Sequence, residues 1–388
     1  MHDHMSVVKA LAGHTLPAVV VDLDAFDRNV DRHVAALAGL PLRVATKSLR
    51  VAALIQRVVD RAGGAVRGLL AYSAREAVKL AERGFSDILV AYPTFDRAEL
   101  AAVARTEGIS LAVDCAAGID RVAAAGVEAG VSVPVVIDVD MSLEVVGLHL
   151  GVRRSPVRTP EEAVALARHI AKTEGVRLDG VLAYEAQIAG LADRGPAVRV
   201  FKRASMKEVT SRRKAIAEAL RADGHELRLV NGGGVGSLDV TTAETGVDEV
   251  AAGSGFYKPH LFDGYRSPFV RSLEPACFFA LPVVRLSAPG FVTCLGGGYV
   301  ASGSVGRDKQ PQPFEPAGLR LLDAEMAGEV QTPLAVPGDV ALQLGDAVLF
   351  RHAKAGEIME RFARVELFQG DRIVEHVATY RGESWSFF

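Results

Sequence analysis

The sequence predicts an α/β protein with a (β/α)8 TIM-type barrel and a second, C-terminal antiparallel β domain. Three observations predict this fold. Between residue 43 and about residue 260, β-branched runs alternate with amphipathic, alanine-rich segments at the spacing of repeated βα units. After Tyr257 the helical period fades, and valine, phenylalanine, glycine and proline dominate. The length of 388 residues accommodates both parts, because such barrels alone commonly take about 250 residues.

Eight apolar segments in the first part have the composition of buried strands, and the segments between them carry apolar residues at three- and four-residue spacing. The predicted strands are 43–47, 68–72, 88–91, 111–114, 133–139, 180–184, 227–230 and 249–252. The predicted helices include 51–61, 74–83, 97–106, 118–129, 160–173 and 205–222. Eight strands with intervening helices favour a closed barrel over an open doubly wound sheet.

The part after the barrel has the texture of a β domain. Its strand candidates are 282–286, 291–295, 346–350 and 372–380. The segment 18–23 is also strand-like, yet it precedes the first βα unit, so we expect it to cross over and join the C-terminal sheet. The predicted domains are a barrel of residues 24–265 and a β domain of residues 1–23 plus 266–388.

The composition argues against several classes of protein. The chain has 44 Lys plus Arg against 47 Asp plus Glu, a formal net charge of −3, which gives no electrostatic case for a nucleic-acid partner. It has no apolar leader and no stretch of about 18 apolar residues, so we expect a cytoplasmic protein without a membrane partner. The cysteines, Cys115, Cys277 and Cys294, lie too far apart in sequence to predict a metal pair, a redox pair or a disulfide framework.

The first predicted strand ends on a lysine. In such a barrel the working groups lie at the C-terminal ends of the strands, and Lys47 follows the apolar Val44 and Ala45 at such an end. A partly desolvated lysine at the barrel mouth is a competent amine for Schiff-base chemistry. The alternative is a solvated lysine in a loop.

Two glycine-rich loops follow the last two predicted strands. The seventh strand runs into Asn231 and residues 232–237, and the eighth runs into residues 253–257. Consecutive glycines let backbone N–H groups approach an anion closely, and the loops after strands 7 and 8 are the usual phosphate site of this fold. A plain tight turn is the alternative explanation of either run alone.

The lysine and the two loops together indicate a cofactor. A strand-1 lysine with a phosphate site at strands 7 and 8 predicts a carbonyl cofactor that carries a phosphate, and pyridoxal phosphate has that form. The sixth strand ends with Tyr184 and is followed by Gln187, which would place an aromatic ring and polar groups over the barrel mouth. Alternatively, Tyr184 only covers the core with its hydroxyl in water.

These motifs resemble those of the fold-type III pyridoxal-phosphate enzymes, the alanine-racemase-like barrels. Within them the chain is similar to the branch of the D-threonine aldolases, 3-hydroxy-D-aspartate aldolases and D-serine dehydratases, of which some members are called amino acid deaminase/aldolase. The resemblance covers nearly the whole chain, from residues 16–18 and 21–24 to the stretch 345–352. It implies a homodimer, because the β domain of one subunit usually closes the barrel mouth of the other.

The resemblance also implies roles for individual residues. Lys47, in the stretch 44–47, matches the lysine that binds the cofactor's aldehyde. The matching cofactor-binding positions are Tyr184, Asn231, Gly233, Gly234, Gly253, Ser254 and Tyr257. Two further positions depart from the family: His149 stands near the place of an arginine, and Gln187 stands at the place of a histidine. We therefore expect His149 and Gln187 to contact the cofactor in place of those residues.

The family's metal site departs from the pattern as well. Metal-dependent members have a histidine, one intervening residue and then a cysteine or aspartate, whereas this chain reads His352-Ala353-Lys354. A protonated lysine cannot ligate a cation, so we expect no divalent metal at the usual place, although His352 would be the ligand if one is bound. We hypothesise that the Lys354 ammonium supplies the positive charge instead. The rival interpretation is a surface salt bridge between Lys354 and Glu357.

The resemblance implies a pyridoxal-phosphate lyase that acts on a β-hydroxy D-amino acid, with retro-aldol cleavage to glycine and an aldehyde ahead of dehydration and deamination. His352 is the candidate acid or base at the β-oxygen, since histidine exchanges protons near neutral pH. A structural histidine is the alternative. The enzymatic alternative is an amino-acid racemase, and the alternative from another class is a non-catalytic pyridoxal-phosphate carrier. The small carriers of this fold lack a long C-terminal β domain, which argues against the second.

Overall fold

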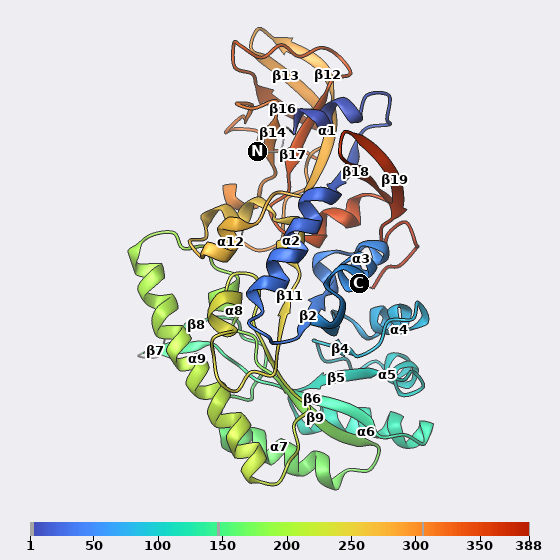
Figure 1. Ribbon diagram of the computed structural model, residues 1–388, viewed down its shortest axis with the longest axis vertical. Helices are drawn as coiled ribbons and strands as arrows, with labels where there is room; N and C mark the ends of the chain where they lie inside the picture. The colour runs from blue at the N-terminus through green and yellow to red at the C-terminus, as the bar shows by residue number, and fades with distance from the viewer. Residues whose placement is uncertain (1–3, 146–147, 305, 388) are drawn as a thin grey trace.

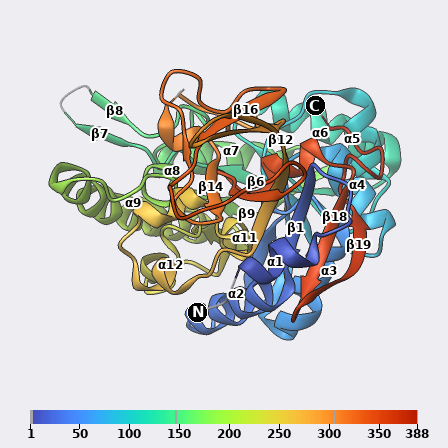
Figure 2. The same cartoon turned by 90° about the horizontal axis from the view of Figure 1, so that it is seen from above.

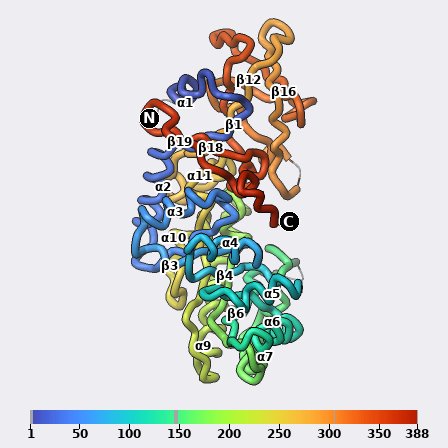
Figure 3. The backbone as a smooth tube through the Cα atoms, turned by 90° about the vertical axis from the view of Figure 1, so that its right-hand side faces the viewer, coloured from blue at the N-terminus to red at the C-terminus, as the bar shows by residue number. Residues whose placement is uncertain are grey.

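The computed structural model describes residues 4–145, 148–304 and 306–387. Figure 1 and Figure 3 show two parts stacked along the long axis, a barrel with its helices and a β domain beyond one end of it. Seen from above in Figure 2, the β-domain strands lie over the barrel. Over the described ranges, none of the helices is long and apolar enough to cross a membrane.

Eight parallel strands in the described ranges close into a barrel in the order β10-β11-β2-β3-β4-β5-β6-β9. They are β2 Leu42–Ala45, β3 Val66–Ala71, β4 Ile88–Val90, β5 Ile109–Val113, β6 Val133–Asp138, β9 Val176–Leu182, β10 Leu229–Gly232 and β11 Glu249–Ala252. The predicted closed barrel is confirmed, and its strands lie at the predicted places with ends that differ by a few residues. The remaining short strands before β9, β7 Leu143–Val145 and β8 Leu148–Leu150, form a hairpin in the loop after β6.

Helices cover the outside of the barrel. The longer ones are α2 Leu23–Ala36, α3 Ala52–Ala62, α4 Ala74–Glu82, α5 Arg97–Ala104, α6 Ala116–Ala129, α7 Pro160–Lys172 and α9 Pro196–Ala222. The shorter ones are α1 Met5–Ala10, α8 Ala186–Ala189, α10 Leu238–Thr241, α11 Ser254–Tyr257 and α12 Pro268–Ser272. Helix α7 begins with a capping box, in which Thr159 accepts from the N–H of Glu162 and the Glu162 carboxylate accepts from the N–H of Thr159. Helix α2 was not predicted, because the polar Asn29 and His33 interrupt its buried face.

The second sheet contains β1 Ala18–Asp22, which pairs antiparallel with β12 Cys277–Ala288 and parallel with β18 Arg364–Gln369. The other strands of this sheet are β13 Phe291–Leu295, β14 Gln312–Glu315, β15 Arg320–Leu321, β16 Gln331–Ala335, β17 Ala347–Arg351 and β19 Arg372–Ala378. The N-terminal strand thus lies between C-terminal strands, and α2 leads from it to the barrel. β16 and β18 were not predicted, because Pro333 and the buried Glu366 interrupt their apolar runs.

Buried charges close the N-terminal end of the barrel. The guanidinium of Arg43, which is fully buried, lies 2.6 Å from a carboxylate oxygen of Glu249 and 3.0 Å from one of Asp87. Asn231 Nδ2 donates to the same Glu249 carboxylate at 2.8 Å. Each of these groups has a partner at this end of the barrel. In barrels of this kind the functional groups lie at the other end, where the strands have their carboxyl termini.

We expect Arg43→Met to lower the free energy of unfolding by about 3–5 kcal/mol, because it leaves the Glu249 charge buried without its main partner. Denaturant unfolding measures this loss. The matched control is Arg97→Met, which removes an 84% exposed side chain 3.4 Å from Glu128 and should cost less than about 1 kcal/mol. Equal losses in the two variants would contradict the assignment of the buried pair.

Candidate active site

A cavity of about 530 Å³ opens at the C-terminal ends of the barrel strands. Its floor and walls are small or apolar residues near the strand ends, among them Ala45, Leu70, Ala91, Leu182 and Ala251. The predicted site residues that line it are Lys47, Tyr184, Asn231, Gly233, Gly234, Gly253, Ser254 and Lys354. Small side chains leave room for a flat ligand at this place, while the polar groups stand around it.

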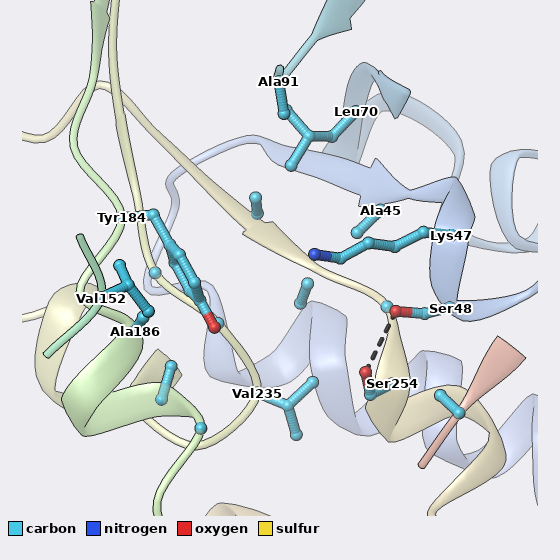
Figure 4. Close-up of a pocket in the computed structure, with 18 of the residues that line it drawn as sticks. Ala45, Lys47, Ser48, Leu70, Ala91, Val152, Tyr184, Ala186, Val235 and Ser254 are labelled. Atoms are coloured by element: carbon cyan, nitrogen blue, oxygen red, sulfur yellow. Dashed lines mark hydrogen bonds between the residues drawn. The ribbon is translucent and has the colours of Figure 1, made fainter. Parts of the chain in front are cut away.

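Lys47 projects into this cavity. It lies in the 3-10 turn Thr46–Ser48 directly after β2, and Figure 4 shows its amine reaching across the space towards the Tyr184 ring. Lys47 Nζ donates to Tyr92 Oη at 2.8 Å. Burial would raise the pKa of the Tyr92 phenol, but the positive charges of Lys47 and Arg154 outweigh burial and lower it. Tyr92 is therefore a group that can exchange a proton with the lysine amine.

An acid stands in the lining of the same cavity. Asp138 closes strand β6, and burial, with the nearby carboxylates of Asp114 and Asp140, raises its pKa to about 7 despite the Arg154 charge. Arg154 also lies over the Tyr92 ring, with its guanidinium carbon 5.7 Å from the ring centroid. Asp138 and Arg154 thus both line the cavity that holds Lys47.

The two glycine-rich loops meet at one wall of the cavity. A Cβ at Gly234 would lie 2.7 Å from Ala189 Cβ, and a Cβ at Gly253 would lie 2.5 Å from Ala45 O. Side chains at these two positions would therefore clash with their neighbours, so the backbone is exposed there. Ser254 lies between the loops and the lysine turn, with its Oγ 3.0 Å from Ser48 Oγ, as the dashed line in Figure 4 marks.

A buried carboxylate fixes the first of these loops. Glu185 accepts from the Arg213 guanidinium and the Ser237 hydroxyl at 2.6 Å, from the Thr241 hydroxyl at 2.7 Å and from Gly233 N–H at 3.1 Å. Burial would raise the pKa of the Glu185 carboxyl, but the Arg213 charge and these hydrogen bonds lower it. The loop, α9 and the end of β9 are therefore joined at one ionised group.

Three of the predicted cofactor contacts lie outside the lining of this cavity. Gln187 is buried and donates to Met141 O and to Ser205 Oγ, so it links the loop after β6 to α9. The fully buried Tyr257 donates to Leu49 O at 3.0 Å. His149 lies on the β7–β8 hairpin, with Nε2 3.2 Å from Val152 O. Contacts with Met141, Ser205 and Leu49 hold Gln187 and Tyr257 outside the lining, whereas the contact of His149 is within its own loop.

The predicted catalytic pair is divided between two cavities. Lys354 lines the main cavity and also a second cavity of about 310 Å³ beside it, whereas His352 lines only the second. His352 is 2% exposed, and burial, with the charge of Arg351, lowers its pKa to about 3. It is therefore neutral near neutral pH.

Lys354 and Glu357 are joined through Ser302. Lys354 Nζ donates to Ser302 O at 2.6 Å, and the Glu357 carboxylate accepts from the N–H of Ser302 at 2.8 Å and from its hydroxyl at 2.7 Å. This arrangement replaces the direct salt bridge considered from the sequence. In the part of the chain that the structure describes, no cluster of three or more His, Cys, Asp or Glu side chains could hold a metal ion.

The sequence reasoning missed Tyr92 and Asp138 as candidate functional residues. Both follow the rule that identified Lys47, since Asp138 is the last residue of β6 and Tyr92 comes shortly after β4. The sequence does not mark Arg154 in this way, because Arg154 does not follow a barrel strand directly but lies in a long loop beyond the hairpin. Its place beside Tyr92 depends on how that loop folds over the barrel mouth.

Residues 21–260 match the protein family described as alanine racemase, N-terminal domain. A relative, the D-threonine aldolase of Arthrobacter sp., is 29% identical over 269 residues, which are 66% of this chain and 65% of the relative. The matched region therefore spans a little under two thirds of that protein's length.

Solved structures show the same fold over nearly the whole chain. The D-threonine aldolase from Filomicrobium marinum has a TM-score of 0.83 at 23% identity and covers 96% of both chains. The D-threo-3-hydroxyaspartate dehydratase from Delftia sp. HT23 has a TM-score of 0.75 at 22% identity, over 95% of this chain and 98% of that chain. An alanine racemase from Clostridium difficile 630 has a TM-score of 0.68 at 14% identity, over 94% and 99%.

The raised pKa of Asp138 predicts a pH dependence of stability. The folded protein keeps this proton up to about pH 7, whereas the unfolded chain loses it near about pH 4. The free energy of unfolding should therefore fall as the pH rises from about 5 to about 8, and Asp138→Asn should reduce that fall. Urea unfolding at about pH 5 and at about pH 8 measures this fall in the free energy of unfolding. Asp339→Asn, at an exposed aspartate, should behave as wild type, and an unchanged fall in Asp138→Asn would refute the assignment.

Proposed function

Because the chain belongs to the alanine racemase N-terminal domain family, we propose that it is a pyridoxal-phosphate-dependent lyase acting on β-hydroxy D-amino acids. The observation that carries this proposal is the Lys47 amine, which projects into a cavity walled by two glycine-rich loops. The names of the aldolase relative and of the dehydratase with the same fold support the substrate class. Retro-aldol cleavage to glycine and an aldehyde is the leading reaction, ahead of dehydration.

The residues of the main cavity fit pyridoxal phosphate. Lys47 would bind the aldehyde, and the backbone at Gly234 and Gly253, where a Cβ would clash, would hold the phosphate with Ser254. Tyr184, across the space from the lysine, would lie beside the ring. When bound, the cofactor accepts the electrons released when a bond at the substrate's Cα breaks.

The chain's own groups would then move protons. Tyr92 holds the Lys47 amine at 2.8 Å and, with its lowered pKa, can take a proton from it and return it. The carboxyl of Asp138, with a pKa of about 7, can act as an acid or a base near neutral pH. We assign these two groups the proton transfers within the main cavity.

We further propose that the Lys354 ammonium supplies the positive charge at the β-oxygen of the substrate. Its amine lines the main cavity, where only the neutral oxygens of Ser302 accept from it at 2.6 and 3.2 Å in the described chain. A fixed cation near the β-oxygen stabilises the alkoxide that forms when the hydroxyl loses its proton, before the bond between Cα and Cβ breaks. His352 is neutral and lies outside this cavity, so Lys354 is the better candidate for contact with the β-oxygen.

The products of the reaction test the proposed function. Purified protein should be incubated without added metal with D-threonine, D-allothreonine, D-serine and D-3-hydroxyaspartate, and the products resolved by mass spectrometry. Glycine with an aldehyde would support the aldolase, and a keto acid with ammonia would assign the chain to the dehydratases. An unchanged mass with inverted configuration would identify a racemase. No turnover of any substrate by cofactor-loaded protein would favour the non-catalytic carrier.

We expect Lys47→Ala to abolish both the cofactor's visible absorbance and turnover, because it removes the amine that would bind the cofactor's aldehyde. Absorbance of the dialysed protein and product formation measure the two losses. Lys79→Ala, at a lysine exposed on α4, is the matched control and should retain both signals. An absorbance retained by Lys47→Ala would show that the cofactor is bound elsewhere.

We expect Lys354→Met to lower kcat by about 100-fold to 1,000-fold, as the loss of one charge-stabilising group does in other enzymes. Lys354→Arg, which keeps the charge, should restore part of the rate. A chelator should leave the wild-type rate unchanged. If activity instead required added manganese or zinc and disappeared with the chelator, the ammonium would not have replaced a metal ion.

We also propose that the protein is a homodimer. Sedimentation of the cofactor-loaded protein would test this proposal.

A further inference from the structure

The C-terminal end of the chain packs against the barrel near the lysine turn. Residues 380–387 follow β19, and this C-terminal segment lies against α4 (Figure 1). The Arg75 side chain of α4 donates to Phe387 O at 2.9 Å. At the end of the same helix, the Arg83 guanidinium carbon lies 5.1 Å from the centroid of the Trp385 ring. The last residues of the segment are therefore attached to a barrel helix.

The first residue of the segment, Tyr380, contacts two residues that hold the lysine turn. Its N–H donates to Arg50 O at 2.9 Å, and Arg50 Nε in turn donates to Lys47 O at 3.2 Å. Its side chain is buried, and its hydroxyl donates to Glu76 Oε1 at 2.9 Å. The C-terminal segment thus reaches the lysine turn both through its backbone and through a buried phenol.

Glu76 is a buried carboxyl at which three parts of the chain meet. It lies in the first turn of α4, and its Oε2 accepts from Tyr72 N–H at 2.7 Å at the end of β3. Its Oε1 accepts from the Tyr380 hydroxyl. It also forms a hydrogen bond with the side chain of Thr46, the residue before Lys47. The end of β3, the lysine turn and the C-terminal segment are therefore joined at this group.

The Glu76 carboxyl can change its charge near neutral pH. Burial raises its pKa to about 7, although its hydrogen bonds and the charge of Arg50 lower it. Arg50 is itself paired with Glu360, which accepts from Arg50 Nη1 at 2.8 Å. Burial raises the pKa of the Tyr72 and Tyr380 phenols, so both stay protonated near pH 7. Of Glu76 and the two phenols, only the carboxyl therefore titrates there.

The proton on Glu76 decides how Thr46 is bonded. The Thr46 hydroxyl donates to Leu70 O at 3.1 Å, so its single hydrogen is used there. A protonated Glu76 can donate to the Thr46 oxygen and leave that bond in place. An ionised Glu76 instead competes with Leu70 O for the Thr46 hydrogen. The bonding of the residue before Lys47 thus depends on Glu76.

We propose that Glu76 and Tyr380 are positioning residues for Lys47, and that the C-terminal segment holds the lysine turn where its amine reaches into the main cavity. Neither side chain is part of the lining of that cavity, so both act through Thr46 and Arg50. This inference rests on the proposed function, because the amine that it positions is the one that would bind the cofactor.

The loss of one hydroxyl tests this proposal in the cofactor-loaded protein. Tyr380→Phe keeps the ring but removes the hydrogen bond to Glu76. It should lower kcat more than it changes KM, and it should speed cofactor release about tenfold, the size expected for one buried hydrogen bond. The matched control Ser110→Ala removes a buried hydroxyl that donates to Asp179 at 2.9 Å near the start of β5. It should leave kcat and cofactor release unchanged.

Thermal unfolding separates positioning from a purely structural contact. Both variants lose one buried hydroxyl that is bonded to a carboxylate, so both should lower the melting temperature. Only Tyr380→Phe should also change kcat and cofactor release. If it lowered the melting temperature as Ser110→Ala does and left both other quantities at their wild-type values, the contact would be structural and the proposal wrong.

Chemical labelling tests the positioning without cofactor or turnover. Acetic anhydride labels accessible amines, and peptide mass spectrometry gives the labelling rate of Lys47 relative to that of the exposed Lys79. This labelling ratio should rise about threefold in Tyr380→Phe, because the lysine turn opens more often when a contact is lost, and it should not change in Ser110→Ala. A rise without cleavage of any hydroxy amino acid would refute the reaction and leave the positioning in place. An unchanged ratio in a protein that cleaves D-threonine would refute the positioning alone.

The pH dependence of the labelling ratio tests the part assigned to Glu76. Between about pH 5 and about pH 9 the wild-type ratio should contain a change centred near pH 7, where Glu76 ionises. Glu76→Gln should remove this change, because its amide can donate to Thr46 at every pH as the protonated carboxyl does. Asp138→Asn removes the other carboxyl with a pKa of about 7 and should keep the change. A wild-type profile in Glu76→Gln would overturn the proposal.

Discussion

The site depends on the buried ion pair between Glu185 and Arg213. Its 2.6 Å contact joins the end of β9 to α9, and the same carboxylate accepts from Gly233 N–H and Ser237 Oγ in the loop after β10. Removing either charge would leave the other buried without a partner, which proteins tolerate poorly. The conformation in which Gly233 and Gly234 line the cavity is therefore fixed by contacts with a buried carboxylate.

The distribution of paired and unpaired charge distinguishes the two ends of the barrel. At the closed end, Arg43, Glu249 and Asp87 satisfy one another. At the open end, the cavity is lined by four cations, Lys47, Arg50, Arg154 and Lys354, and by three carboxyls, Asp138, Asp140 and Glu357. This small excess of cations at the mouth of the barrel favours the entry of anionic ligands. A phosphate-bearing cofactor and an amino-acid carboxylate are both of this kind.

The sequence predicts the site wherever backbone position alone decides the outcome. Lys47 and the two glycine loops follow barrel strands, and strand order fixes where such residues lie. The sequence predicts fewer of the site's contacts where the direction of a side chain determines what that side chain touches. Tyr257 and Gln187 stand on the right loops, yet Leu49 O and Ser205 Oγ, both distant in sequence, turn them into the core. No local pattern encodes those partners, because packing between distant segments creates them.

The β domain contributes to the chemistry through one close approach. A Cβ at Gly356 would lie 2.0 Å from Lys47 O, so only a glycine allows the turn Gly356–Arg361 to rest against the lysine turn. Lys354, two residues before Gly356, lines the main cavity. The barrel holds the amine and the glycine loops, while the β domain contributes Lys354 and Glu357 to the lining of the same cavity. A substitution in that short segment can therefore alter the charge at the cavity without altering the barrel strands that carry Lys47 and the glycine loops.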